Sequence, residues 1–368
     1  MSTKADFEFR WATADDEPDI RSLAGSVAMP GSVVVRFARE PDYFLGTSIM
    51  GDPCDVLIAR HRPDGQLAGI ACRAEQRAYL NGEVAPLGYI GQIRIAPSYR
   101  GHWLVSLGAE CVKEASPPGL FYFGVIASEN PRARQLLVGS RPPGGLHTRH
   151  ICGLTTCAIL LRPKRAQRTP GVDVLPGSGE TLAEIVAFLR LKGPRRQFFP
   201  AYSLEDFRGG SKLRGLRPED ILVARRENEV VGVMAVWDQA AYKQDFVDSY
   251  GPALQRLRPA YDLAARFLGA RPLTPPGQAI HLAFAACICI GDDDPAVMQA
   301  LLSSCLKNAY QRGKAYLMLG LCDDDPLLPV ARRPLHIQYH SDLFAVSWSD
   351  EPVRQLDGRI PYIEIATL

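Results

Sequence analysis

The sequence predicts a mixed α/β protein of two tandem domains, each built on a twisted, mostly antiparallel sheet flanked by helices. The length of 368 residues corresponds to about two domains of ordinary size. Hydrophobic residues make up 46 % and charged residues 22 %, as is typical of a globular protein. The 32 Gly and 29 Pro indicate many turns and short elements instead of a helical bundle.

An internal repeat supports the division into two domains. Residues 55–60 read DVLIAR and residues 220–225 read DILVAR, and each is followed by a polar turn and a second apolar strand, as in a β-hairpin. A second match, in the same order, joins GLFYFGVIASENP (119–131) to KAYLMLGLCDDDP (314–326). Two matches in one order indicate a duplicated unit.

The repeat sets the expected domain boundaries. We expect a first domain over residues 1–161 and a second over 172–368, joined by the basic, proline-bounded linker RPKRAQRTPG (162–171). The second match is displaced farther along the chain than the first. We attribute the difference to a helical insertion at about 243–278, which ends in a proline-rich stop.

In the first domain, strands and helices alternate. Residues 7–13 alternate in polarity and predict a strand, and the acidic residues and Pro18 after it favour a helix over 15–27. Apolar residues at helical spacing predict a helix over 102–116, which ends at Pro117. The other expected elements are helices at 39–50 and 130–139 and strands at 55–61, 66–76, 89–97, 120–127 and 149–161.

In the second domain, the same order recurs. A buried strand over 279–291 leads into an amphipathic helix over 294–313, and Asp292–Asp294 stand where that helix begins. We interpret these carboxylates as a helix N-cap, with a metal site as the alternative. The other expected elements are helices at 181–193 and 203–210 and strands at 220–227, 229–238, 315–321, 337–348 and 361–368.

Charge and cysteine content narrow the classes of function. Lys plus Arg number 42 and Asp plus Glu 40, a net charge of +2, which argues against DNA, tRNA and membranes as partners. One stretch, RLKGPRRQFFPAY (190–202), leaves two interpretations open: a helix end with its aromatic residues in the core, or a site for an anion or a tRNA end.

Nine cysteines without zinc spacing, and the absence of an apolar signal segment in MSTKADFEFRW, predict a cytoplasmic protein with free, mostly buried thiols and no metal.

One segment resembles a known family. IRIAPSYRGHWLVSLGAECVKEA is similar to the strand–loop–helix that binds acyl-CoA in the GNAT acyltransferase superfamily, where the pattern runs P-x-Y-R-G-x-G-x-G/A. Pro97, Tyr99, Arg100 and Gly101 match this pattern, while its last two small positions fall on Trp103 and Val105. A second match to the family, N-x-x-A-x-x-L, is carried by Asn130, Ala133 and Leu136. The resemblance covers about residues 5–161, and the second domain shares it only through the repeat.

The resemblance implies an acyl-CoA site in the first domain. A helix N-terminus presents unpaired backbone N–H groups and a positive partial charge, which suits the pyrophosphate of coenzyme A. By the resemblance, residues of the strand contact pantetheine, the helix start holds the pyrophosphate and Asn130 touches the pantetheine arm. The implied cofactor-binding residues are Ile93, Arg94, Ile95, Arg100, Gly101, His102, Trp103, Leu104, Val105 and Asn130.

The candidate catalytic residue is Tyr89. It falls where some members of the family have a glutamate base, and a tyrosine with a pKa near 10 would instead position a water or act as an acid. Core packing is the alternative role. The tyrosine that protonates the leaving thiolate in many members falls on Leu137, and the C-terminal carboxylate that serves N-myristoyltransferases as a base would fall on Leu368.

The resemblance implies transfer of an acetyl or other acyl group from acyl-CoA to the amine of a small molecule or peptide. The amine would attack the thioester directly, while a backbone N–H near Ile93–Ile95 polarises the carbonyl. Two alternatives stay open: a transferase that uses a long-chain acyl or aminoacyl-tRNA donor, and a non-catalytic acyl-CoA sensor or scaffold. The sequence predicts a monomer or homodimer.

Overall fold

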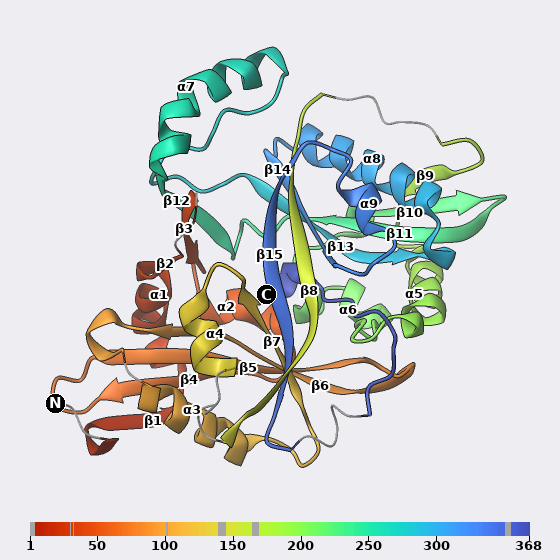
Figure 1. Ribbon diagram of the computed structural model, residues 1–368. Coiled ribbons are helices and arrows are strands. Elements are labelled where there is room, and N and C mark those ends of the chain that lie inside the picture. The colour runs from red at the N-terminus through yellow and green to blue at the C-terminus, as the bar shows by residue number, and fades with distance from the viewer. Residues whose placement is uncertain are drawn as a thin grey trace.

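The structure is a computed structural model that describes residues 4–29, 31, 33–100, 102–138, 145–163, 169–349 and 355–368. Fifteen strands and nine α-helices lie within these residues (Figure 1). The strands are β1 (Phe7–Trp11), β2 (Ala28–Met29), β3 (Val33–Ala38), β4 (Cys54–His61), β5 (Leu67–Leu80), β6 (Glu83–Ile95), β7 (Tyr122–Ala127), β8 (His147–Leu160), β9 (Asp173–Pro176), β10 (Ile221–Arg226), β11 (Glu229–Trp237), β12 (Gln244–Tyr250), β13 (Leu282–Ile290), β14 (Tyr316–Cys322) and β15 (His336–Ser347). The α-helices are α1 (Glu17–Ser26), α2 (Tyr43–Thr47), α3 (His102–Ala115), α4 (Pro131–Val138), α5 (Leu182–Lys192), α6 (Leu204–Phe207), α7 (Pro252–Phe267), α8 (Pro295–Gln311) and α9 (Leu328–Ala331).

Twelve strands form one continuous sheet in the order β1-β4-β5-β6-β7-β15-β8-β14-β13-β11-β10-β9. Most neighbours are antiparallel, and the parallel pairs are β6 with β7 and β13 with β14. The predicted mixed, mostly antiparallel α/β architecture is therefore confirmed.

The two halves of the chain exchange strands at the centre of the sheet. Strand β15 pairs with β7 on one side and with β8 on the other, and β8 pairs in turn with β14. Figure 1 shows β15 and β8 running side by side through the middle of the molecule. A strand late in the chain thus lies between two early ones.

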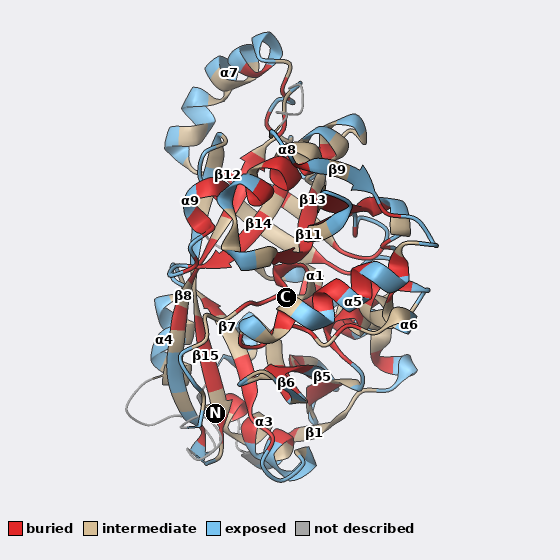
Figure 2. Ribbon diagram, turned by 90° about the vertical axis from the view of Figure 1, so that its right-hand side faces the viewer, coloured by how far each residue is buried: buried red, intermediate tan, exposed pale blue. Residues whose placement is uncertain are grey.

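The hydrophobic core follows the strands. Strand β13 is apolar on both faces, and all of its residues after Leu282 are buried. Helix α8 covers this part of the sheet with Val297, Leu301 and Cys305, which are fully buried at helical spacing. Figure 2 shows the same pattern: the strands are mostly red, while α5 is red on one side and blue on the other. All nine cysteines are free and seven are buried, as predicted. Among the helices of the described ranges, none combines the length and apolar character needed to cross a membrane.

The structure corrects three expectations. The predicted strand at 361–368 is wrong: only Pro361 makes a bridge, to Gln197, and the segment ends in a 3-10 turn at Ile365–Thr367. The expected helical insertion contains a strand as well as a helix, because β12 pairs with β3 in a separate three-stranded sheet before α7 begins. The predicted helix at 39–50 shortens to α2 and a 3-10 turn.

Candidate functional site

The first half contains a V-shaped opening between β6 and β7. These parallel strands pair only at Gly88–Tyr122 and Tyr89–Phe123. Beyond that point β6 follows β5 and β7 follows β15, so the two strands diverge. Strand β6 is buried at Tyr89 and half-buried from Ile90 to Ile95, as a strand with one open edge should be.

A β-bulge marks the opening. Gln92 has a positive φ of 53°, and the register of β5 against β6 shifts between Ile70 and Cys72. A bulge leaves one residue outside the ladder and turns its backbone groups away from the neighbouring strand. Gln92 and Ile93 have no partner in the ladder between β5 and β6.

The predicted pyrophosphate loop leads from this strand to a helix, as expected. Helix α3 begins at His102, one turn after the 3-10 turn Pro97–Tyr99. The Trp103 ring packs against Phe7, with ring centroids 4.6 Å apart, and Leu104 and Val105 are buried. Leu104 and Val105 therefore lie in the core, the half-buried Trp103 packs against it, and the backbone N–H groups of all three belong to the first turn. Gly101 and the side chain of His102 lie outside the described residues.

The remaining predicted residues lie on β6, in the loop before α3 and at the start of α4. Arg100 is exposed, and Arg94 is half-buried, donates to the Ile93 carbonyl at 3.1 Å and has a pKa lowered by burial. Asn130 caps α4, since its Oδ1 accepts from the Ala133 amide at 3.1 Å. The roles expected of these residues stay predictions.

Tyr89 lies at the closed end of the opening. Its ring packs against Phe123 with centroids 5.0 Å apart, and its hydroxyl lies directly over Gly91, where an added Cβ would be 1.9 Å away. Burial is the main cause that raises the pKa of Tyr89 well above its ordinary value. A tyrosine so placed keeps its proton, so it is no base.

Behind Tyr89 lies a buried cationic pair that sequence reasoning missed. Arg39 is 3 % exposed, and its Nε has no hydrogen-bond partner among the described residues. Lys243 Nζ donates to the main-chain oxygens of Ala366 at 2.9 Å and of the last residue, Leu368, at 2.8 Å, and Leu368 packs both on the cluster that contains Tyr89 and on the core of the second half. Burial, followed by the charge of Arg39, lowers the pKa of Lys243 to about 7. No local pattern signals this pair, because its members come from different halves of the chain.

The second half repeats the V-shaped opening between β13 and β14. These parallel strands pair from Leu282–Tyr316 to Phe284–Met318 and then diverge, and Cys287 has a positive φ of 51°. Cys287 lies 195 residues after Gln92, the same spacing as between the matched prolines Pro131 and Pro326. The bulge therefore belongs to the duplicated unit.

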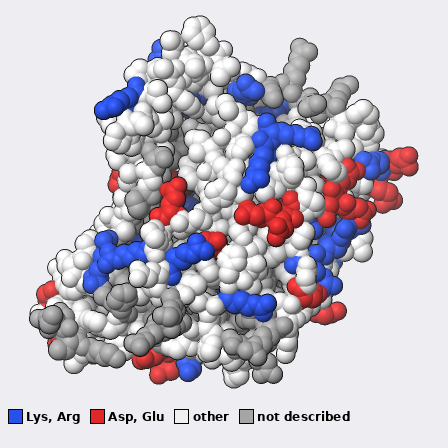
Figure 3. All heavy atoms as spheres, viewed as in Figure 1, with Lys and Arg blue, Asp and Glu red and all other residues white. Residues whose placement is uncertain are grey.

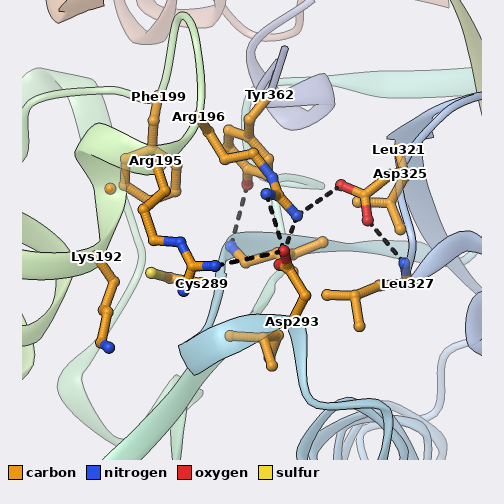
Figure 4. A pocket seen from close by; sticks show the side chains of 13 residues that line it. Lys192, Arg195, Arg196, Phe199, Cys289, Asp293, Leu321, Asp325, Leu327 and Tyr362 are labelled. Carbon is orange, nitrogen blue, oxygen red and sulfur yellow. Dashed lines mark hydrogen bonds and ion pairs between the residues drawn. The ribbon is translucent and has the colours of Figure 1, made fainter. Parts of the chain in front are cut away.

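The chain itself fills the second opening. Glu364 Oε2 accepts from the Cys287 amide at 2.7 Å, and the Tyr362 hydroxyl accepts from the Ile288 amide at 3.1 Å and donates to Glu364 at 2.9 Å. Tyr202 donates to the same carboxylate oxygen at 3.2 Å. Burial raises the pKa of Glu364. The cavity left beside these groups is about 20 Å³, room for about one water (Figure 4).

Ion pairs occupy the helix start of the second half. Asp294 caps α8 by accepting from the Ala296 amide at 2.8 Å, as predicted. Asp293 pairs with Arg196 at 2.6 Å, and Arg196 also reaches Asp325 at 3.2 Å (Figure 4). The basic stretch 190–202 is thus paired with the acidic run, and its aromatic residues Phe198, Phe199 and Tyr202 are buried. Across the described ranges, no group of three or more His, Cys, Asp or Glu side chains is arranged to hold a metal.

The chain is similar to known proteins in its fold. No protein-family model matches the chain, and no curated protein matches its sequence. Several solved structures match its fold. A GCN5-related N-acetyltransferase from Sphaerobacter thermophilus is similar over 100 % of both chains, with 14 % identity and a TM-score of 0.57.

Two other structures extend the likeness. The N-myristoyltransferase of Saccharomyces cerevisiae, with bound myristoyl-CoA, is similar over 99 % of this chain and 91 % of its own, with 10 % identity and a TM-score of 0.61. A GCN5-related glucosamine N-acetyltransferase region of a fungal multidomain enzyme is similar over 93 % of this chain and 38 % of its own, with 12 % identity and a TM-score of 0.60. The chain therefore has the fold of the GCN5-related N-acetyltransferase (GNAT) superfamily, in tandem form.

Proposed function

We propose that the protein is an N-acyltransferase that binds acyl-CoA in the opening between β6 and β7. One observation carries this proposal: the same divergence of parallel strands with a bulge occurs twice, and in the second copy the bulge amide of Cys287 donates to a carboxylate oxygen. The solved structures of similar fold support it, since they are N-acetyltransferases and an N-myristoyltransferase bound to myristoyl-CoA.

The second opening indicates what the first can bind. There, the amide of the bulge residue Cys287 donates to a carboxylate oxygen at 2.7 Å, and the next amide donates to a hydroxyl. By the repeat, the amides of Gln92 and Ile93 occupy the same places in the first opening. A thioester carbonyl in the position of the Glu364 carboxylate would be polarised by these amides, and they would stabilise its oxygen as negative charge develops during attack.

The reaction follows from this placement. The acceptor nitrogen attacks the carbonyl carbon, the C–S bond breaks and coenzyme A leaves as a thiolate. Tyr89, whose hydroxyl lies at the closed end of the opening, is the proposed donor to that thiolate. Lys243, whose pKa is lowered to about 7, is the proposed acceptor of the proton that the amine loses. Pantetheine would lie along Ile93–Ile95 and Asn130, and the pyrophosphate at Arg100 and the start of α3.

A long-chain donor is the second candidate. It is favoured by the similarity to the N-myristoyltransferase, which extends over 99 % of this chain. Isothermal titration with acetyl-, octanoyl- and myristoyl-CoA distinguishes the two candidates, because a pocket built for a long chain binds tighter as the chain lengthens. Equal affinity for all three donors would contradict a long-chain site.

The proposal is tested by an arginine variant with a control on the same helix. Arg100→Glu places a negative charge before α3 and should weaken acyl-CoA binding about tenfold or more, since a phosphate contact becomes a repulsion. Lys113→Glu makes the same charge change on an exposed residue in the last turn of α3 and should leave binding unchanged. Release of free thiol from acyl-CoA in the presence of a mixture of amines measures transfer. No binding of any coenzyme A thioester would refute the proposal, and binding without transfer would favour a sensor.

A further inference from the structure

Helix α7 stands clear of the body of the protein. Figure 1 shows it projecting beyond β12, with no other element on its outer side, and Figure 2 shows the same from the side. Its inner face is anchored: Leu254 and Tyr261 pack on the cluster of Val247, Tyr250 and Leu273. The Arg258 guanidinium lies over the Tyr250 ring, 5.6 Å from its centroid, which is close enough for a cation–π contact.

The outer face of α7 is apolar as well. Phe267 is 85 % exposed, Leu257 62 % and Leu263 56 %. Together with Ala253, Ala260 and Ala264, which are also exposed, they form a stripe at helical spacing along the whole helix. A single exposed leucine is ordinary, but a continuous exposed apolar stripe marks a surface that binds something.

Unpaired positive charge borders this stripe. Arg256 and Arg266 are exposed on the outer half of α7, and neither forms an ion pair within the described part of the chain. The acidic residue of the helix, Asp262, faces inward, where it pairs with Arg258 at 3.5 Å and accepts from the Leu273 amide at 2.8 Å. Figure 3 shows this lobe as a mostly white surface with blue side chains. The outer face of α7 is therefore apolar and cationic.

We propose that α7 docks the protein on an anionic lipid surface. An exposed apolar stripe beside arginines suits the boundary between headgroups and acyl chains, where apolar side chains insert and arginines contact lipid phosphates. A second copy fits less well, because a symmetric pairing of α7 helices would bring like-charged arginines together. The near-neutral net charge, which led us to expect no membrane partner, does not exclude so local a patch. Docking does not depend on acyl transfer.

Vesicle flotation tests the proposal on the full chain. The protein should float with vesicles of phosphatidylcholine that contain about a third phosphatidylglycerol, bind vesicles of phosphatidylcholine alone far less, and be released by high salt. Replacing Arg256 and Arg266 with Gln should weaken binding about fivefold per arginine, equivalent to about 1 kcal/mol each. Leu257→Ser with Phe267→Ser should abolish flotation.

Control variants separate lipid docking from misfolding and from dimer formation. Leu191→Ser removes an apolar side chain that is 70 % exposed on α5, and it should leave flotation unchanged. Circular dichroism and acyl-CoA binding should match wild type in every α7 variant, so a failed acyl-CoA site and a failed docking surface remain distinguishable. The proposal is overturned if the serine variant still floats, if charge in the lipid makes no difference, or if light scattering shows a dimer that the α7 variants dissociate.

Discussion

Replacing Glu364 with alanine tests how strongly the chain holds itself in the second opening. The change removes one buried oxygen that accepts from the Cys287 amide and from the hydroxyls of Tyr362 and Tyr202, at 2.7, 2.9 and 3.2 Å. A buried donor left without a partner costs about 1–3 kcal/mol. The substitution also removes a buried carboxylate whose desolvation destabilises the folded state, and this gain offsets part of the loss from the unpaired donors. We expect Glu364→Ala to lower the free energy of unfolding by about 3–5 kcal/mol.

Urea unfolding followed by tryptophan fluorescence measures this loss. Glu364→Gln is the matched variant, because its amide oxygen can replace Oε2 while its NH₂ group takes the place of Oε1, which has no partner in the described structure. It should cost less than about 1.5 kcal/mol. Glu110→Ala, at an exposed position of α3, should cost almost nothing. A loss below about 1 kcal/mol for Glu364→Ala would show that residues 362–364 do not hold the second opening closed.

The same residue predicts a pH dependence. Burial raises the pKa of Glu364 above its ordinary value of 4.5, so the folded state prefers the protonated acid. The stability that Glu364 contributes is therefore complete below pH 4.5, the pKa of the unfolded state, and is lost as pH rises through the raised pKa of the folded state. Wild type should therefore lose stability relative to Glu364→Gln as pH rises through that window. A constant difference between the two proteins would contradict the assigned burial of the charge.

The other predictions concern the first opening and its surroundings. Tyr89→Phe should lower acyl transfer about 100-fold while acyl-CoA affinity by calorimetry stays constant; unchanged turnover would leave Tyr89 a packing residue only. Between about pH 7 and the ordinary lysine pKa of 10.5, Lys243 is protonated only in the unfolded state, so the stability of wild type should rise with pH by up to about 1.4 kcal/mol per pH unit. Lys243→Met should remove this rise, as measured by urea unfolding at a series of pH values. Gly88→Ala should destabilise the protein by about 1–3 kcal/mol, since the added Cβ would lie 2.1 Å from the Tyr122 ring. Gly25→Ala, which lies in a helix with open space around it, should be neutral or stabilising. Equal melting points for the two variants would refute the close approach of Gly88 to Tyr122.

Local patterns predicted most of the elements. The hairpins at 55–76 and 220–238 and the helix at 102–116 were predictable because apolar spacing and proline stops act within a few residues. The segment YIEIATL alternates as a strand does, yet it forms none, because its alternate side chains enter the second opening. That outcome depends on the opening between β13 and β14, which is distant in the sequence and therefore not contained in any local pattern.

The candidate site was predictable only in part. The pattern P-x-Y-R-G located the loop before α3, and the repeat located the strand before it. Neither signalled the positive φ of Gln92 and Cys287, because these residue types do not mark the left-handed region as glycine or asparagine would. Arg39 and Lys243 meet only through tertiary packing.

The exchange of β15 and β8 has a consequence for synthesis. When residues 1–161 leave the ribosome, β7 and β8 lack the strand that belongs between them, because residues 336–347 have not yet been made. Until then one edge of β7 and both edges of β8 are unpaired, since β14 is also still to be made, so a chaperone is needed most during this interval. For the same reason neither half can be excised intact: each carries a strand that completes the other.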